Sequence, residues 1–165
     1  PQQPCDTANY VTEVQLGRCF LRRVVDGSHN VPHSVVYRDD FAIAFLNRFP
    51  TLLGYCLVAP LEHREDVIGD FTEVEYLRLQ TVVRRVGYAV SKTVPTERTY
   101  ILSLGSNQGN AHVHWHVAPL PPGVPYEQQQ FGALQIESTG YLDLPSAERD
   151  QLAANIRSAL PPDST

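Results

Sequence analysis

The alternation of apolar and polar positions predicts a run of short β-strands in the first half of the chain. Segments rich in β-branched and aromatic residues cover 41–46 and 55–59. A turn-prone connection that contains Pro50 and Gly54 joins them. The stretch 34–37 adds a short strand before them, so we expect an antiparallel meander.

The period then lengthens to that of an amphipathic helix in the segment 70–92. Its apolar side chains recur three or four residues apart: Tyr76, Leu79, Val82, Val83, Val86 and Val90. Thr72 and Glu75 have the spacing of a capping box, and Phe71 can pack on Tyr76 as a hydrophobic staple. The sequence therefore marks where this helix begins.

Two further strands are expected at 98–104 and 112–119, because the loop 105–111 between them is short enough only for a tight connection. Together these segments predict an α+β fold in which a roughly five-stranded antiparallel sheet packs against one long helix.

The C-terminal part is less regular. Residues 119–140 are rich in Pro, Gln and Gly and indicate a surface excursion, within which 126–136 could form a short helix. A C-terminal helix is predicted over 146–160, with Ser146 as its N-cap and a frayed tail after it. Its apolar face consists of Leu152, Ile156 and Leu160.

Composition and charge narrow the class of protein. The 165 residues, 42% of them hydrophobic and 19% charged, are typical of one globular domain spanning 1–165. A net charge of −5 argues against nucleic acid as a partner, which needs a broad basic surface. No apolar run would span a membrane and no secretion signal opens the chain. Because three cysteines do not form a disulfide framework, we expect a cytoplasmic location.

Three of the six histidines, His112, His114 and His116, fall within five residues, each separated by one apolar residue. On a strand these imidazoles share one face, about 6.6 Å apart at the backbone, while the residues between them share the other. That spacing disfavours three ligands on one zinc ion. Metal binding by fewer of them, buried structural histidines and chemistry on an anion remain as alternatives, and we favour the last.

The loop before the histidines has a composition suited to an anion. Gly105 and Gly109 allow close backbone approach, while Ser106, Gln108 and Asn110 add hydroxyl and amide donors. A plain hairpin turn is the alternative interpretation.

The run 112–118 resembles the signature of the histidine triad superfamily, in which three histidines alternate with apolar residues. Residues from about 19 to 120 can be matched to that superfamily, which leaves 121–165 as a C-terminal extension. The similarity is closest to the branch of fragile histidine triad proteins and bacterial dinucleoside polyphosphate hydrolases. The positions that carry it are Asn47, Pro50, Gly54, Pro60 and Gln108.

The resemblance implies a role for each histidine. His114 would attack the α-phosphorus of a nucleotide and form a covalent nucleotidyl-histidine, which requires a neutral imidazole whose other nitrogen donates to a carbonyl. His112 would support it, and His116 would contact the α-phosphate.

It also implies binding residues. Ser106 and Gln108 would stabilise charge on the phosphoryl oxygens, and Asn47 would bind the ribose. Phe20, Phe45 and Leu46 are candidates for an apolar slot around the base, and the equally weighted alternative is that they are plain core residues.

The implied function is a nucleotide hydrolase or nucleotidyltransferase that cleaves a phosphoanhydride or phosphoramidate, with dinucleoside polyphosphates as first-choice substrates. A phosphorylase or nucleotidylyltransferase is one alternative, and a nucleotide-binding sensor or interaction module with negligible turnover is another. No tightly bound cofactor is expected, although Mg²⁺ can accompany the nucleotide. Relatives imply a homodimer.

Two departures from the superfamily stand out. Zinc-binding branches carry Cys-x-x-Cys, whereas here Arg22 follows Cys19 at that spacing, so that Cys19, His63 and His112 lack a fourth ligand and no metal site is predicted. Tyr55 stands where many relatives have His, which leaves the substrate preference open.

Overall fold

The computed structural model describes residues 2–4, 6, 8, 12, 19–27, 34–105 and 110–162. The strands are β1 (Gln2–Gln3), β2 (Val35–Arg38), β3 (Ala42–Leu46), β4 (Cys56–Pro60), β5 (Arg98–Ser103), β6 (Trp115–Leu120) and β7 (Tyr141–Leu142). The helices are α2 (Phe20–Val25), α3 (Glu73–Thr93), the 3₁₀ turn η1 (Tyr126–Gln128), α4 (Phe131–Leu134), α5 (Ile136–Thr139) and α6 (Ser146–Ser158).

The main sheet has five antiparallel strands in the order β2-β3-β4-β6-β5, which confirms the predicted fold class. Strand β6 lies between β4 and β5, with His116 opposite Leu57 on one side and Leu102 on the other. A second sheet, which the sequence patterns did not predict, pairs β1 with β7.

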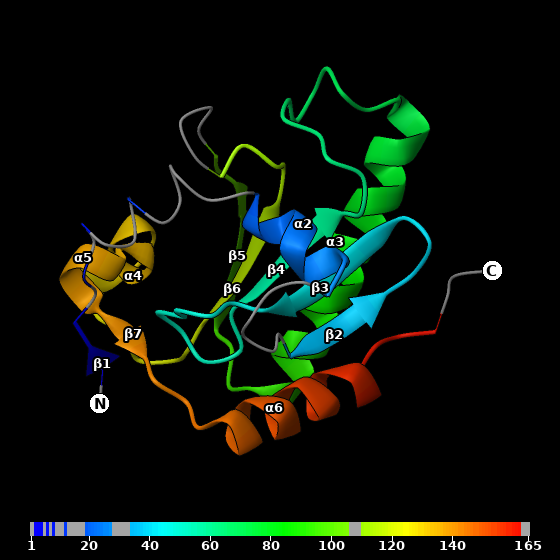
Figure 1. The fold of residues 1–165 in the computed structure, drawn as a ribbon. Helices are drawn as coiled ribbons and strands as arrows, with labels where there is room; N and C mark the ends of the chain where they lie inside the picture. Colours follow the sequence, from blue (N-terminus) through cyan, green and yellow to red (C-terminus); the bar gives the residue numbers. More distant parts are fainter. Residues whose placement is uncertain are drawn as a thin grey trace.

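One face of the main sheet packs against α3 and α6 (Figure 1). The inward residues of β3, β4 and β6, together with Leu79, Val86 and Val90 of α3, form one buried cluster. Thr72 and Glu75 make both hydrogen bonds of the predicted capping box, and the Phe71 and Tyr76 rings lie 6.5 Å apart. The long helix and its start are therefore confirmed.

The opposite face carries the short helix α2. Leu21 and Val24 of α2 pack on Phe45 of β3 and on alternate residues of β4 and β6, and Leu134 of α4 joins the edge of this cluster. Figure 1 shows α2 in front of the sheet and α3 behind it, with α4 and α5 beyond β5 and β6. Strands β3 and β4 are buried along their whole length because both of their faces are covered.

Several predicted ends of strands and helices shift by one or two residues, and two further details of the prediction were wrong. Strand β6 begins at Trp115 and not at residue 112. Pro145, not Ser146, is the N-cap of α6, because its carbonyl accepts the first helical hydrogen bond from Arg149 N–H at 3.0 Å. The segment 126–136 does contain a short helix, α4, but Gln130, whose φ of 56° lies outside helical backbone, separates it from the 3₁₀ turn η1. No described helix is long and apolar enough to cross a membrane.

Candidate functional site

The site lies where the chain enters β6, and its backbone departs from the strand ladder there. The carbonyl of His112 accepts a hydrogen bond from His114 Nδ1 at 2.8 Å, and the carbonyl of His114 accepts one from Ser103 Oγ at 2.8 Å. Side chains thus bind carbonyls that a regular strand would present to its neighbours, which explains why β6 starts late. Val113, Trp115 and Val117 still pack toward α3, so the histidines lie on the opposite face from them, as predicted. That face carries α2, a helix that the sequence patterns did not predict.

His112 is 1% exposed and has a partner on each ring nitrogen. Its Nε2 lies 3.0 Å from the carbonyl of Pro60, which can only accept, so Nε2 carries the proton. Its Nδ1 is then an acceptor, 3.5 Å from the thiol of Cys19. Burial lowers the pKa of His112 to about 4, assisted by the nearby His63, so this imidazole is neutral at pH 7. Its contacts suit a supporting role.

His114 has the tautomer that a nucleophile needs. Because Nδ1 donates to the carbonyl of His112, the lone pair of the neutral ring is on Nε2. The imidazole is buried, and burial lowers its pKa against the opposing effect of that hydrogen bond. The ring therefore holds its lone pair at neutral pH without needing a separate base.

His116 lies beside His114, with ring centroids 4.8 Å apart. Its Nδ1 is 2.9 Å from the hydroxyl of Tyr55, while its buried Nε2 has no partner among the described residues. Burial lowers the pKa of His116 to about 3, with a further contribution from His114. This nitrogen therefore has hydrogen-bonding capacity that the described residues do not use.

Asn47 lies just after β3, and the backbone ties it to the same cluster. Its N–H donates to the carbonyl of Tyr55 at 2.8 Å, and its side-chain Oδ1 accepts from Phe49 N–H at 3.1 Å. The structure thus brings Asn47 next to Tyr55 and, through it, to His116.

Ser106 and Gln108, the predicted phosphate-binding side chains, lie outside the described residues. The two ends of their loop approach closely, because a Cβ on Gly105 would meet the carbonyl oxygen of Asn110 at 2.9 Å. Only glycine permits that approach, whereas the predicted approach of this loop to an anion stays a prediction.

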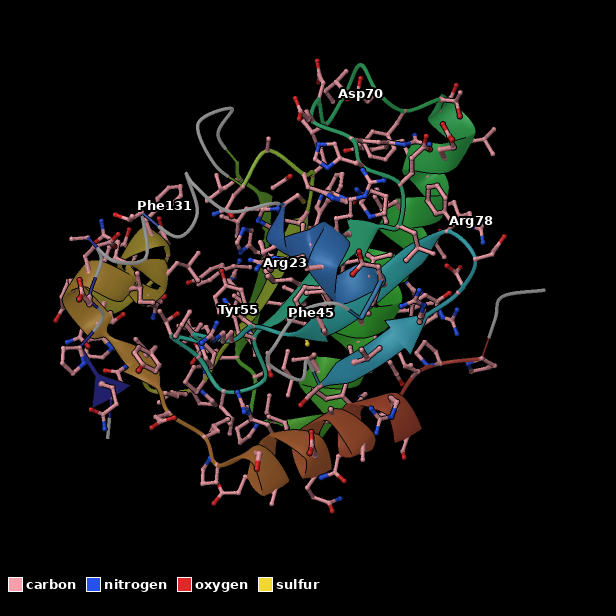
Figure 2. The ribbon with its side chains drawn as sticks, in the orientation of Figure 1. Arg23, Phe45, Tyr55, Asp70, Arg78 and Phe131 are labelled. Carbon is pink, nitrogen blue, oxygen red and sulfur yellow. The ribbon has the colours of Figure 1, made fainter. Side chains whose placement is uncertain are left out.

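The proposed base slot needs correction. Phe20 and Phe45 belong to the cluster on the α2 face, which also includes Tyr55; Figure 2 labels Phe45 and Tyr55. Leu46 belongs to the cluster against α3, on the opposite face of the sheet. Adjacent residues of a strand point to opposite faces, so Leu46 cannot share a slot with Phe45.

Among the described residues, Cys19, His63 and His112 form one group whose candidate metal-binding atoms lie within 4.8 Å of one another. A structural zinc ion needs four ligands. In the Cys-x-x-Cys pattern of zinc-binding relatives the second cysteine would lie three residues after Cys19, and here that position is Arg22, a cation that cannot coordinate the ion. His63 Nε2 also bonds Glu65 at 2.9 Å. These three residues do not make a complete structural zinc site.

Sequence patterns missed three partners of the triad. The carbonyl of Pro60 and the hydroxyl of Ser103 fix backbone and ring orientations, and no periodicity signals such contacts. Tyr55 did have a signal, since it departs from the His of many relatives, but its contact with His116 emerged only from the structure.

Comparisons with known proteins find one matching family. The HIT domain family matches residues 28–122. An uncharacterized HIT-like protein of Saccharolobus solfataricus is 32% identical over 104 residues, which cover 61% of this chain and 73% of that protein.

Solved structures share the fold. A hypothetical histidine triad nucleotide-binding protein of Sulfolobus tokodaii matches with a TM-score of 0.68 and 23% identity, covering 86% of this chain and 91% of that one. A zinc-bound histidine triad family protein of Mycobacterium smegmatis matches with a TM-score of 0.64 and 21% identity over the same shares.

Proposed function

The chain belongs to the HIT domain family, and on that premise we propose that it is a nucleotide hydrolase or nucleotidyltransferase whose nucleophile is His114 Nε2. The observation that carries the proposal is the hydrogen bond of 2.8 Å from His114 Nδ1 to the carbonyl of His112. It leaves a lone pair on Nε2 of a neutral imidazole beside a second imidazole that has a nitrogen without a partner.

In the proposed reaction, His114 Nε2 attacks the α-phosphorus of a nucleotide. A nitrogen–phosphorus bond forms, and the bond from phosphorus to the leaving group breaks with its electron pair on the leaving group. Water or another acceptor then attacks the same phosphorus and frees the histidine. His116 contacts the α-phosphate, His112 holds the ring of His114, and Ser106 and Gln108 stabilise the phosphoryl oxygens.

The proposed substrate class is supported by the position of Asn47 and by the resemblance to the fragile histidine triad branch. Asn47 binds the ribose: its Oδ1 is engaged with Phe49 N–H, which leaves its amide nitrogen as the donor to the sugar hydroxyls. Dinucleoside polyphosphates, the substrates of the fragile histidine triad branch, are our first choice, and Mg²⁺ enters only with the nucleotide. Homodimer formation and a cytoplasmic location stay predictions.

Intact-mass spectrometry after brief incubation with dinucleoside polyphosphates and nucleoside phosphoramidates tests the nucleophile. Wild type should gain the mass of one nucleotidyl group and release products, whereas His114→Ala should do neither, with turnover lower by about 10⁴-fold or more. Circular dichroism of the variant checks that it folds. Adduct formation on His114→Ala, or an adduct on neither protein, would overturn the proposal.

The same assay separates the alternatives. Release of nucleoside diphosphate only when phosphate is added would identify a phosphorylase, and nucleotide transfer to a sugar phosphate would identify a nucleotidylyltransferase. Tight nucleotide binding with negligible turnover would favour a sensor or interaction module.

A further inference from the structure

The hydroxyl of Tyr55 lies 2.9 Å from His116 Nδ1, and it is the one hydrogen-bond partner of that imidazole among the described residues. The two rings meet edge to face, with centroids 5.8 Å apart. The other ring nitrogen, Nε2, is buried without a partner. Among the described residues, one phenol therefore supplies the only hydrogen bond to the His116 ring.

The backbone holds that phenol in place. Gly54, at a φ of 84°, turns the chain into β4 immediately before Tyr55. The N–H of Tyr55 donates to the carbonyl of Leu52 at 3.2 Å, and its carbonyl accepts from Asn47 N–H at 2.8 Å. Its side chain packs in the cluster on the α2 face and is 6% exposed. A residue fixed on both sides and buried can position a neighbour.

The direction of the hydrogen bond follows from which groups each option would leave unsatisfied. If Tyr55 accepted from Nδ1–H, its own buried proton would have no described acceptor, and Nε2 would present a lone pair. If Tyr55 donates, its hydroxyl and Nδ1 satisfy each other, and Nε2 carries a proton. Burial raises the pKa of Tyr55 to about 12, so the phenol keeps the proton that it donates.

We infer that Tyr55 is a positioning residue that fixes His116 in the Nε2–H tautomer, so that this nitrogen donates a hydrogen bond to a phosphoryl oxygen of the substrate. His114 and His116 then have opposite tautomers, one with a lone pair for phosphorus and the other with a donor for oxygen. The identity of the anion rests on the proposed function, whereas the tautomer does not.

Nitrogen-15 NMR of the imidazoles tests the tautomer without any substrate. In wild type at pH 7, His116 should show a protonated Nε2 and an unprotonated Nδ1. Tyr55→Phe should shift the Nδ1 resonance and mix the two tautomers. The matched control is Tyr37→Phe in β2, which removes a phenol hydroxyl that donates to Asp39 at 2.9 Å. This variant should leave the His116 resonances unchanged. A wild-type Nδ1–H tautomer, or spectra unaffected by Tyr55→Phe, would overturn the inference.

Calorimetric binding of adenosine 5′-monophosphate and of adenosine tests the donor. Tyr55→Phe should weaken the nucleotide by about tenfold, the effect of impairing one hydrogen bond to a charged group, and leave the nucleoside unchanged. Equal weakening of both ligands, or of neither, would overturn the contact with the phosphate.

The two proposals fail differently. A wild type that neither binds nucleotide nor forms an adduct overturns the proposed function while the NMR result still decides the tautomer. An adduct on wild type together with a His116 tautomer that ignores Tyr55→Phe overturns only the present inference.

Discussion

The two faces of the main sheet are built in different ways. The face against α3 and α6 is closed by apolar side chains that belong to long, regular elements. The face with α2 has a smaller apolar cluster and also carries the imidazoles, whose partners are carbonyls, a thiol and a phenol. The first face should supply most of the stability, because apolar burial dominates folding. The α2 face buries polar groups, which costs free energy of folding, and a site that binds a polar ligand requires such groups.

The sharpest way to break this comparison is to damage the α3 face alone. Leu79 is fully buried there, and Leu79→Ala should lower the free energy of unfolding by about 2–5 kcal/mol while turnover per folded molecule stays constant. Val74→Ala on the same helix is the control, since Val74 is 77% exposed and should change stability by less than about 0.5 kcal/mol. Urea unfolding and an activity assay check both. A large loss of turnover in folded Leu79→Ala would show that the faces are coupled.

Sequence patterns were informative about this face because its signals are local. The period of α3 and the Thr72–Glu75 capping box lie within one continuous segment, and the structure has both. The α2 face depends on contacts between distant segments, such as Cys19 with His112 and Tyr55 with His116. The histidine spacing indicated a site, but it could not show that His114 bonds the carbonyl of His112 and delays the start of β6.

Acid should lower the stability of the protein through groups in both regions, but the loss should begin at a higher pH for the α2 face than for the start of α3. Burial lowers the pKa of His116 in the folded protein to about 3, whereas the ordinary value for a histidine in the unfolded chain is 6.5. Below pH 6.5 the unfolded chain therefore binds more protons than the folded one. Wild type therefore loses stability from pH 6.5 downward. His116→Gln removes that share of the loss, so the variant should gain on wild type as pH falls from about 6.5 toward 3.

The start of α3 offers the contrasting window. The hydrogen bond from Arg64 lowers the pKa of Glu75 to about 2 from an ordinary value of 4.5, so its contribution is present above pH 4.5 and is lost as pH falls toward 2. The deficit of Glu75→Gln relative to wild type should shrink only in that lower window. Urea midpoints between pH 7.5 and 2.5 measure both variants. A Glu75→Gln deficit that already shrinks above pH 5, or a His116→Gln gain that begins only below pH 4.5, would contradict the assignment.

The smallest expected effects give the closest comparison, because one hydroxyl can be removed from each region. Thr72→Ala deletes the cap of α3, and Ser103→Ala deletes the donor to the carbonyl of His114. Each should cost about 1 kcal/mol of stability, the usual value of a cap or of one hydrogen bond. Only Ser103→Ala should also slow turnover, by up to about tenfold, because a small displacement of the nucleophile lowers the rate steeply.

The pair is informative because equal losses of stability remove instability as an explanation for any difference in rate. If Ser103→Ala reduces kcat with little change in KM, the hydroxyl acts on the geometry of His114 during the reaction and not on ground-state binding. If both variants slow turnover equally, the late start of β6 has no special role, and the two faces differ in composition alone. The carbonyls of His112 and His114 accept hydrogen bonds from side chains instead of from the strand ladder. The comparison of the two variants decides whether the bond to His114 matters for the reaction.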